Sequence, residues 1–136
     1  MSDRAKILIA DDEPDCIEFV REALADGPYD VVSASDGEEA LTVARAEAPN
    51  LIILDVQMPK ATGFEVFQRL RQEADLASVP VIMLTGIAER TGVKVDGQDM
   101  GAFMGAEPDA YIDKPIEPIV LQQAVKRLLK GQAGSA

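Results

Sequence analysis

Five short strand-like runs recur along the chain, and a polar residue follows each of them. They cover residues 6–10, 29–34, 51–54, 80–84 and 110–112, and most of the segments between them carry apolar residues at helical spacing. A continuous apolar run is typical of a strand covered on both faces, and such strands form parallel sheets flanked by helices. The pattern therefore predicts one α/β domain, in which a doubly wound, five-stranded parallel sheet carries helices on both faces.

Turn and capping residues indicate where two of the expected helices begin. Pro14 suits the first turn of a helix, and we expect Asp12 to cap that helix. Asp36 and Gly37 predict a turn that leads into the next helix.

The length of 136 residues matches a single ordinary domain. We expect a short extension over residues 1–5, the domain itself over 6–130 and a frayed tail of small residues over 131–136.

Composition excludes several classes of function. The chain has no histidine, which excludes Ser-His-Asp triads, Cys-His pairs, zinc sites with histidine ligands and a role as phosphohistidine donor. A net charge of −11 argues against nucleic-acid binding, which requires a basic face. No apolar run approaches the roughly 18 residues of a membrane span, so no membrane insertion is expected. One cysteine and no recognisable signal peptide favour a cytoplasmic location.

Charged and hydroxyl side chains lie where the predicted strands end. These residues are Asp11, Asp12, Asp55, Thr85 and Lys114. Ligands of parallel sheets bind outside the carboxyl ends of the strands, so we expect these side chains to converge there. Three carboxylates placed together repel one another unless a cation binds between them. With oxygen ligands and no histidine, Mg²⁺ is the best candidate for that cation.

Each of these residues also has an ordinary structural explanation. An aspartate after a strand is often a cap or a turn residue, an isolated threonine is often a turn hydroxyl, and a Lys-Pro pair is often a solvated turn. Cys16 lies on an apolar helical stripe, and we interpret it as a core residue rather than a redox centre. The functional interpretation depends on the combination, because unrelated turn residues would not place complementary groups at several strand ends.

Taken together, the strand-end residues resemble the receiver domain of two-component response regulators. The similarity is carried by Asp11-Asp12, by the segment 48–59 with Asp55 and Met58-Pro59, by Gly63, by Thr85 and by Tyr111-Ile112-Asp113-Lys114-Pro115. It extends from about residue 6 to residue 129 and so covers nearly the whole chain. The resemblance implies a flavodoxin-like sheet with strand order 2-1-3-4-5.

The resemblance also implies a chemical role for each site residue. Asp55 would accept a phosphoryl group from a histidine kinase and form an aspartyl phosphate. Asp12, Asp55 and the main-chain carbonyl of Gln57 would bind Mg²⁺ directly, and Asp11 would act mostly through water. The metal would neutralise charge on the transferring oxygens, and Lys114 would pair with one of them.

A phosphorylation switch is a further implication of the resemblance. Thr85 would turn its hydroxyl to the phosphoryl group, and the Tyr111 ring would move into the space left behind. The bond between Lys114 and Pro115 would be cis. The added charge of about −1.5 to −2 would then change protein contacts. The segment 87–108 is longer than is usual in the family and rich in glycine, so its helix is expected to be displaced, shortened or mobile.

The leading hypothesis is a stand-alone receiver that signals through an unidentified protein target and turns over no external substrate. A phosphorelay intermediate that passes phosphate to a histidine phosphotransfer protein would use the same site, and a phosphorylation-independent scaffold would share the fold. Phosphatases of the haloacid dehalogenase type carry Asp-x-Asp after the first strand, whereas this chain has Asp11-Asp12-Glu13. A nucleotide or flavin binder is unsupported, because no glycine-rich loop follows the first strand. The cognate kinase and the oligomeric state stay open.

Overall fold

The computed structural model describes residues 4–58, 60–85 and 109–134. Their elements, in chain order, are β1 (Ala5–Ala10), α1 (Pro14–Ala23), β2 (Tyr29–Ala34), α2 (Gly37–Glu47), β3 (Leu51–Asp55), α3 (Gly63–Gln72), β4 (Val81–Thr85), β5 (Ala110–Asp113) and α6 (Pro118–Gly134). The displaced helix expected within 87–108 lies outside the described residues.

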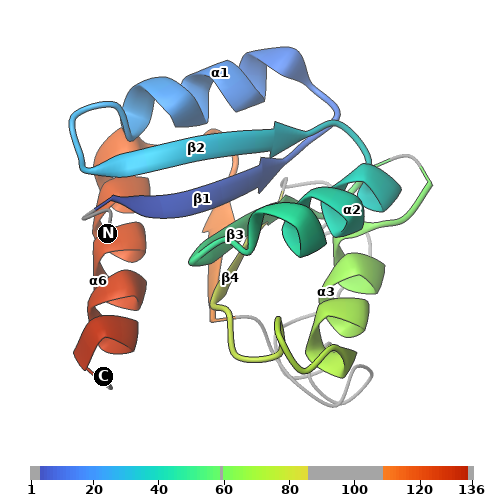
Figure 1. Cartoon of the computed structure of the whole chain (residues 1–136). Coiled ribbons are helices and arrows are strands. Elements are labelled where there is room, and N and C mark those ends of the chain that lie inside the picture. Colours follow the sequence, from blue (N-terminus) through green and yellow to red (C-terminus); the bar gives the residue numbers. More distant parts are fainter. Residues whose placement is uncertain (1–3, 59, 86–108, 135–136) are drawn as a thin grey trace.

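All five strands form one sheet in the order β2-β1-β3-β4-β5, and every neighbouring pair is parallel (Figure 1). The register pairs Ala10 with Leu54, Asp55 with Leu84 and Thr85 with Asp113. The ends of β1, β3, β4 and β5 therefore meet at one edge of the sheet. The predicted fold class and strand order are both confirmed.

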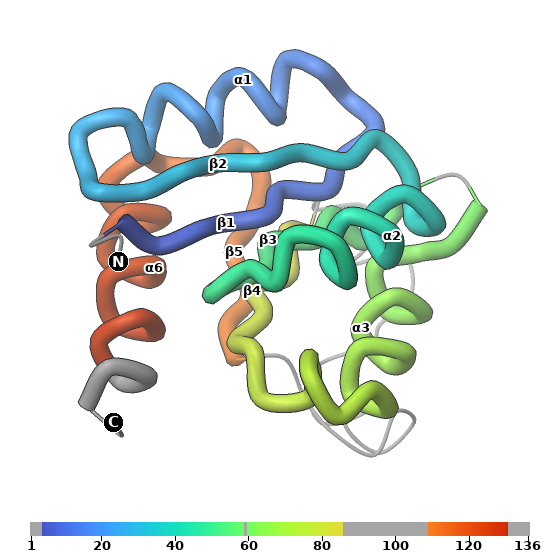
Figure 2. The backbone as a smooth tube through the Cα atoms, in the orientation of Figure 1, coloured from blue at the N-terminus to red at the C-terminus, as the bar shows by residue number. Residues whose placement is uncertain are grey.

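Alternate side chains of each central strand fill two separate cores. In β3, Leu51 and Ile53 belong to the core under α1 and α6, whereas Ile52 and Leu54 belong to the core under α2 and α3. Figure 2 shows these two helix pairs on opposite sides of the sheet, and α1 packs against α6 as α2 packs against α3. Burying one such side chain contributes about 1.5–3 kcal/mol, which explains why the central strands are apolar throughout.

The start of α1 differs from the sequence prediction. Pro14 occupies the first helical position as expected, but the capping residue is Glu13, and its side chain makes no capping hydrogen bond. Asp12 is therefore not the cap, because it lies one residue too early. Instead, Asp11 accepts a hydrogen bond from the Glu13 backbone N–H at 2.9 Å. Asp12 is left exposed at the edge of the sheet.

The start of α2 agrees with the prediction, because the Asp36 side chain accepts a hydrogen bond from the Glu39 backbone N–H.

The last helix, α6, extends to Gly134. Among the helices of the described residues, none combines the length and the apolar character that a membrane span requires.

The loop after β3 is held tightly against the end of that strand. The Gly63 backbone N–H donates to the carbonyl of Val56 at 2.8 Å, and Thr62 and Glu65 form a reciprocal capping box at the start of α3. A Cβ atom at Gly63 would overlap the carbonyl oxygen of Asp55 and would lie 3.0 Å from the Met83 sulfur. A side chain at this position would therefore push α3 away from Asp55.

We predict that Gly63→Ala lowers the free energy of unfolding by about 1–3 kcal/mol, because the new methyl group meets fixed backbone. Urea denaturation followed by circular dichroism measures this change. Gly27→Ala is the matched control, because its methyl group would first meet the side-chain ring of Tyr29 rather than backbone. Equal losses in the two variants would contradict the prediction.

Candidate functional site

Three carboxylates meet at the carboxyl edge of the sheet. Asp11 and Asp12 follow β1, and Asp55 is the last residue of β3. Each offers an oxygen within 4.8 Å of the others. Asp11 is fully buried and Asp55 is 4% exposed, whereas Asp12 is open to solvent. The structure therefore brings together the three predicted acidic residues, two of them with little access to water.

Lys114 follows β5 and pairs with the two buried carboxylates. Its Nζ lies 3.1 Å from Asp11 Oδ2 and 3.2 Å from Asp55 Oδ1, with a longer contact of 3.4 Å to Glu13 Oε1. Burial alone would lower the pKa of Lys114, but the hydrogen bond and charge of Asp11 and the charge of Asp55 outweigh burial and raise it. The ammonium therefore stays protonated. The peptide bond from Lys114 to Pro115 is cis.

The environment of Asp55 works against its negative charge. Burial raises the pKa of its carboxyl from the ordinary 3.8 to about 6, and the charge of Asp11 adds to the rise. Lys114 opposes both effects without cancelling them. At neutral pH, Asp55 is therefore mainly a carboxylate held at a cost in free energy, a state that a further cation would relieve.

The donor set of this cluster fits a hard cation. It consists of carboxylate oxygens from Asp11, Asp12 and Asp55, and such oxygens are the ligands that Mg²⁺ prefers. The exposed Asp12 leaves one side of the cluster open to solvent. Gln57, whose carbonyl was predicted as a further ligand, is exposed two residues beyond β3. The acidic triad thus has the oxygen donors and the open side that a Mg²⁺ site requires.

Thr85 lies on β4, which pairs with β3, and Tyr111 lies on β5, the strand on the other side of β4. Thr85 ends β4, is 4% exposed, and donates its hydroxyl hydrogen bond to Asp113 Oδ1 at 3.0 Å. Tyr111 lies on β5 opposite Met83 and packs, half-buried, against the core under α2 and α3. The hydroxyl of Thr85 is therefore engaged with a residue of β5.

Cys16 has the structural role assigned to it from the sequence. It lies on α1, half-buried against the core under α1 and α6. Burial raises the pKa of its thiol to about 12, helped by a hydrogen bond to Asp11. The thiol is therefore protonated at neutral pH and is a poor nucleophile.

Two contacts of the site were missed at the sequence level. Glu13 approaches Lys114, and Asp113 accepts the hydrogen bond of Thr85. Both residues stand directly beside recognised site residues in the chain. Their contacts depend on strand register and side-chain direction, which the sequence pattern does not specify.

Most of the chain matches one protein family and many of its members. A model of the family described as response regulator receiver domain matches residues 7–126. The alkaline phosphatase synthesis transcriptional regulatory protein PhoP of Bacillus subtilis is 42% identical over 125 residues, which are 92% of this chain and 48% of that protein. A probable transcriptional regulator, ycf27 of Porphyridium aerugineum, is 40% identical over 93% of this chain and 49% of its own length. The chain spans about half the length of these curated relatives.

Solved structures agree over nearly their full length. The chemotaxis response regulator CheY4 of Vibrio cholerae has a TM-score of 0.77 at 32% identity and covers 92% of this chain and 98% of its own. A CheY-like receiver domain protein of Methanospirillum hungatei has a TM-score of 0.81 at 27% identity, covering 98% of this chain and 99% of its own.

The raised pKa of Asp55 predicts how Asp55→Asn affects stability. Its pKa in the folded chain, about 6, exceeds the ordinary 3.8, so protonation favours folding. The free-energy cost of ionising Asp55 in the folded chain is absent below about pH 4 and fully present above about pH 6 to 7. In EDTA at pH 8, we expect Asp55→Asn to be more stable than the natural chain by about 3 kcal/mol. The gain should disappear as the pH falls to about 4.

Urea denaturation at a series of pH values measures this difference. Asp15→Asn is the control, because it removes an exposed carboxylate on α1 outside the triad. A gain that is independent of pH would contradict the explanation through Asp55.

Proposed function

The chain belongs to the response regulator receiver family, and on this premise we propose that Asp55 is its phosphoacceptor. Receivers of this family are phosphorylated by histidine kinases and are not enzymes that turn over an external substrate. The observation that carries the proposal is the position of Asp55: it ends the central strand between two further carboxylates and the Lys114 ammonium. We propose residues 6–130 as the receiver domain.

The proposed reaction is a phosphoryl transfer between two side chains. A carboxylate oxygen of Asp55 attacks the phosphorus of a phosphohistidine on the donor protein. The bond between phosphorus and the imidazole nitrogen breaks, and the nitrogen keeps the electron pair. The product is an acyl phosphate on Asp55 and a free donor histidine. A pKa of about 6 supports this role, because most Asp55 side chains are ionised at neutral pH while remaining poorly solvated.

Asp12, Asp55 and the main-chain carbonyl of Gln57 are proposed to bind Mg²⁺ directly, and Asp11 mostly through water. When bound, Mg²⁺ supplies positive charge that neutralises the transferring oxygens. Asp11 also holds Lys114 in place through its contact of 3.1 Å. Asp12 contributes the carboxylate that is open to solvent, where an ion can enter.

Lys114 is proposed to bind a phosphoryl oxygen. Its Nζ already lies 3.2 Å from Asp55 Oδ1, and a phosphoryl group on Asp55 would bring further anionic oxygens next to it. The ammonium is held between two carboxylates, so it is oriented before the phosphoryl group arrives.

Thr85 and Tyr111 are proposed to report phosphorylation. In this proposal the Thr85 hydroxyl turns to the phosphoryl group, and the Tyr111 ring moves towards the space that Thr85 leaves. Thr85 is buried at the end of β4, and Tyr111 lies on the neighbouring strand. The result is a change in contacts with a downstream protein. We place these events in the cytoplasm, which suits a chain with one reduced cysteine.

We predict that acetyl phosphate with Mg²⁺ adds about 80 Da, one phosphoryl group, to the intact mass of the chain. Asp55→Asn and addition of EDTA should each abolish the adduct, whereas Asp15→Asn should keep it. A phosphorylated histidine kinase is the second donor to be tested. An adduct that survives in Asp55→Asn, or no adduct with either donor in a folded chain, would contradict the proposal.

We also predict that millimolar Mg²⁺ raises the melting temperature, because an ion bound only by the folded chain stabilises it. Asp12→Asn should remove most of this rise at little structural cost, since Asp12 is exposed. Asp15→Asn should respond to Mg²⁺ like the natural chain. Equal rises in all three proteins would indicate nonspecific ion binding and exclude the triad as the site.

A further inference from the structure

The Thr85 hydroxyl is held by a carboxylate of the neighbouring strand. It donates to Asp113 Oδ1 at 3.0 Å. We propose that Asp113 is a positioning residue that keeps Thr85 turned away from Asp55 in the unphosphorylated chain and thereby opposes the phosphorylated arrangement. This inference rests on the proposed phosphorylation of Asp55 and assigns a role to a residue that touches neither the phosphoryl group nor the metal.

The parallel pairing of β4 and β5 fixes the two partners side by side. Thr85 and Asp113 are opposite each other in the register, and the Lys114 backbone N–H donates to the Thr85 carbonyl at 2.7 Å. Thr85 is therefore anchored twice to the end of β5, once through its main chain and once through its side chain.

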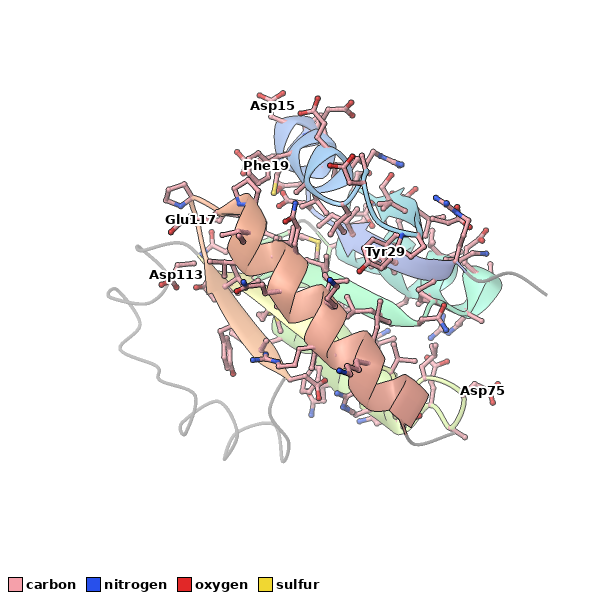
Figure 3. The ribbon with its side chains drawn as sticks, turned by 90° about the vertical axis from the view of Figure 1, so that its left-hand side faces the viewer. Asp15, Phe19, Tyr29, Asp75, Asp113 and Glu117 are labelled. Atoms are coloured by element: carbon pink, nitrogen blue, oxygen red, sulfur yellow. The ribbon has the colours of Figure 1, made fainter. Side chains whose placement is uncertain are left out.

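The side chains of two neighbouring residues at this end of β5 point in opposite directions. Lys114 reaches the two buried carboxylates on β1 and β3, whereas Asp113 holds the hydroxyl of Thr85 and is exposed. Figure 3 shows Asp113 at the end of β5 near Glu117, which precedes α6. The Asp113 carboxylate thus lies away from the acidic cluster, whereas the Lys114 ammonium lies within it.

The chemistry of a threonine hydroxyl makes the two arrangements exclusive. A hydroxyl carries a single proton to donate, so Thr85 cannot donate to Asp113 and to a phosphoryl oxygen at the same time. An ionised acceptor makes a stronger hydrogen bond than a neutral one. Since Thr85 is 4% exposed, water is a poor substitute for a lost partner. Phosphorylation must therefore draw the hydroxyl proton from one anionic acceptor to another.

Weakening the Asp113 acceptor should favour the phosphorylated arrangement. A hydrogen bond of typical net strength corresponds to about a five-fold change in an equilibrium constant. We expect Asp113→Ala to bind beryllofluoride, an analogue of the phosphoryl group, about five-fold more tightly in the presence of Mg²⁺. Asp113→Asn keeps a neutral acceptor and should give a smaller gain. Titration followed by ¹⁹F NMR measures the apparent affinity.

Two controls separate this role from a general effect of charge or structure. Glu117→Gln removes one negative charge near Asp113 but leaves the acceptor of the Thr85 hydroxyl in place, and its affinity should equal that of the natural chain. In the Thr85→Ala background, Asp113→Ala should have no effect, because the coupling that it breaks is already absent. This double-mutant cycle isolates the Thr85 interaction from every other contact of Asp113.

The outcomes are distinguishable. If the natural chain binds beryllofluoride but Asp113→Ala behaves like Glu117→Gln, or if its gain persists without Thr85, the positioning role is wrong and the proposed function stands. If the folded natural chain neither binds beryllofluoride nor accepts a phosphoryl group, both proposals fail. Should Asp113→Ala not fold, Asp113→Asn in the same cycle decides between these outcomes.

Discussion

Everything at the carboxyl edge of the sheet depends on the interaction of Lys114 with two buried carboxylates. Asp11 and Lys114 are 103 residues apart in sequence, yet their charged atoms lie within 3.1 Å. Such groups lose most of their hydration, and their attraction recovers that cost only in part, as the raised pKa of Asp55 indicates. The negative charge of the site is therefore only partly neutralised, and a further cation would stabilise the folded chain.

The two cores supply the stability that makes such a site tolerable. The apolar stretches 7–10 of β1, 51–54 of β3 and 81–84 of β4 face both cores, and their side chains are completely excluded from water. The same register that aligns these apolar side chains also brings Asp55 and Thr85 to adjacent strand ends. The loop behind them is fixed by Gly63, which has no side chain to separate α3 from the Asp55 carbonyl. The strand register thus produces both the tight packing of the cores and the unfavourable clustering of carboxylates at the sheet edge.

Sequence reasoning succeeded where topology alone decides position. Once the runs ending at Ala10, Leu54 and Leu84 were interpreted as parallel strands, the residues after them had to share one edge. It failed where a shift of one residue, in strand register or in the start of a helix, changes which side chains meet. Asp12 was expected to cap α1, but the helix begins so that Glu13 is the cap. The hydroxyl of Thr85 was expected only to face a phosphoryl group, because nothing in the sequence shows that Asp113 lies opposite it.

The dipeptide at the end of β5 shows why a phosphoryl group can act as a switch here. The ammonium of Lys114 attracts an anionic group placed at Asp55, whereas Asp113 holds the hydroxyl of Thr85 away from Asp55. Each interaction is of the order of 1–3 kcal/mol for a hydrogen bond to a charged group, so neither arrangement of Thr85 is overwhelmingly favoured. A ligand shifts such an equilibrium only through its different affinity for the two states. A group bearing about −1.5 to −2 charges next to Lys114 supplies that difference, because it competes with a single carboxylate for one proton.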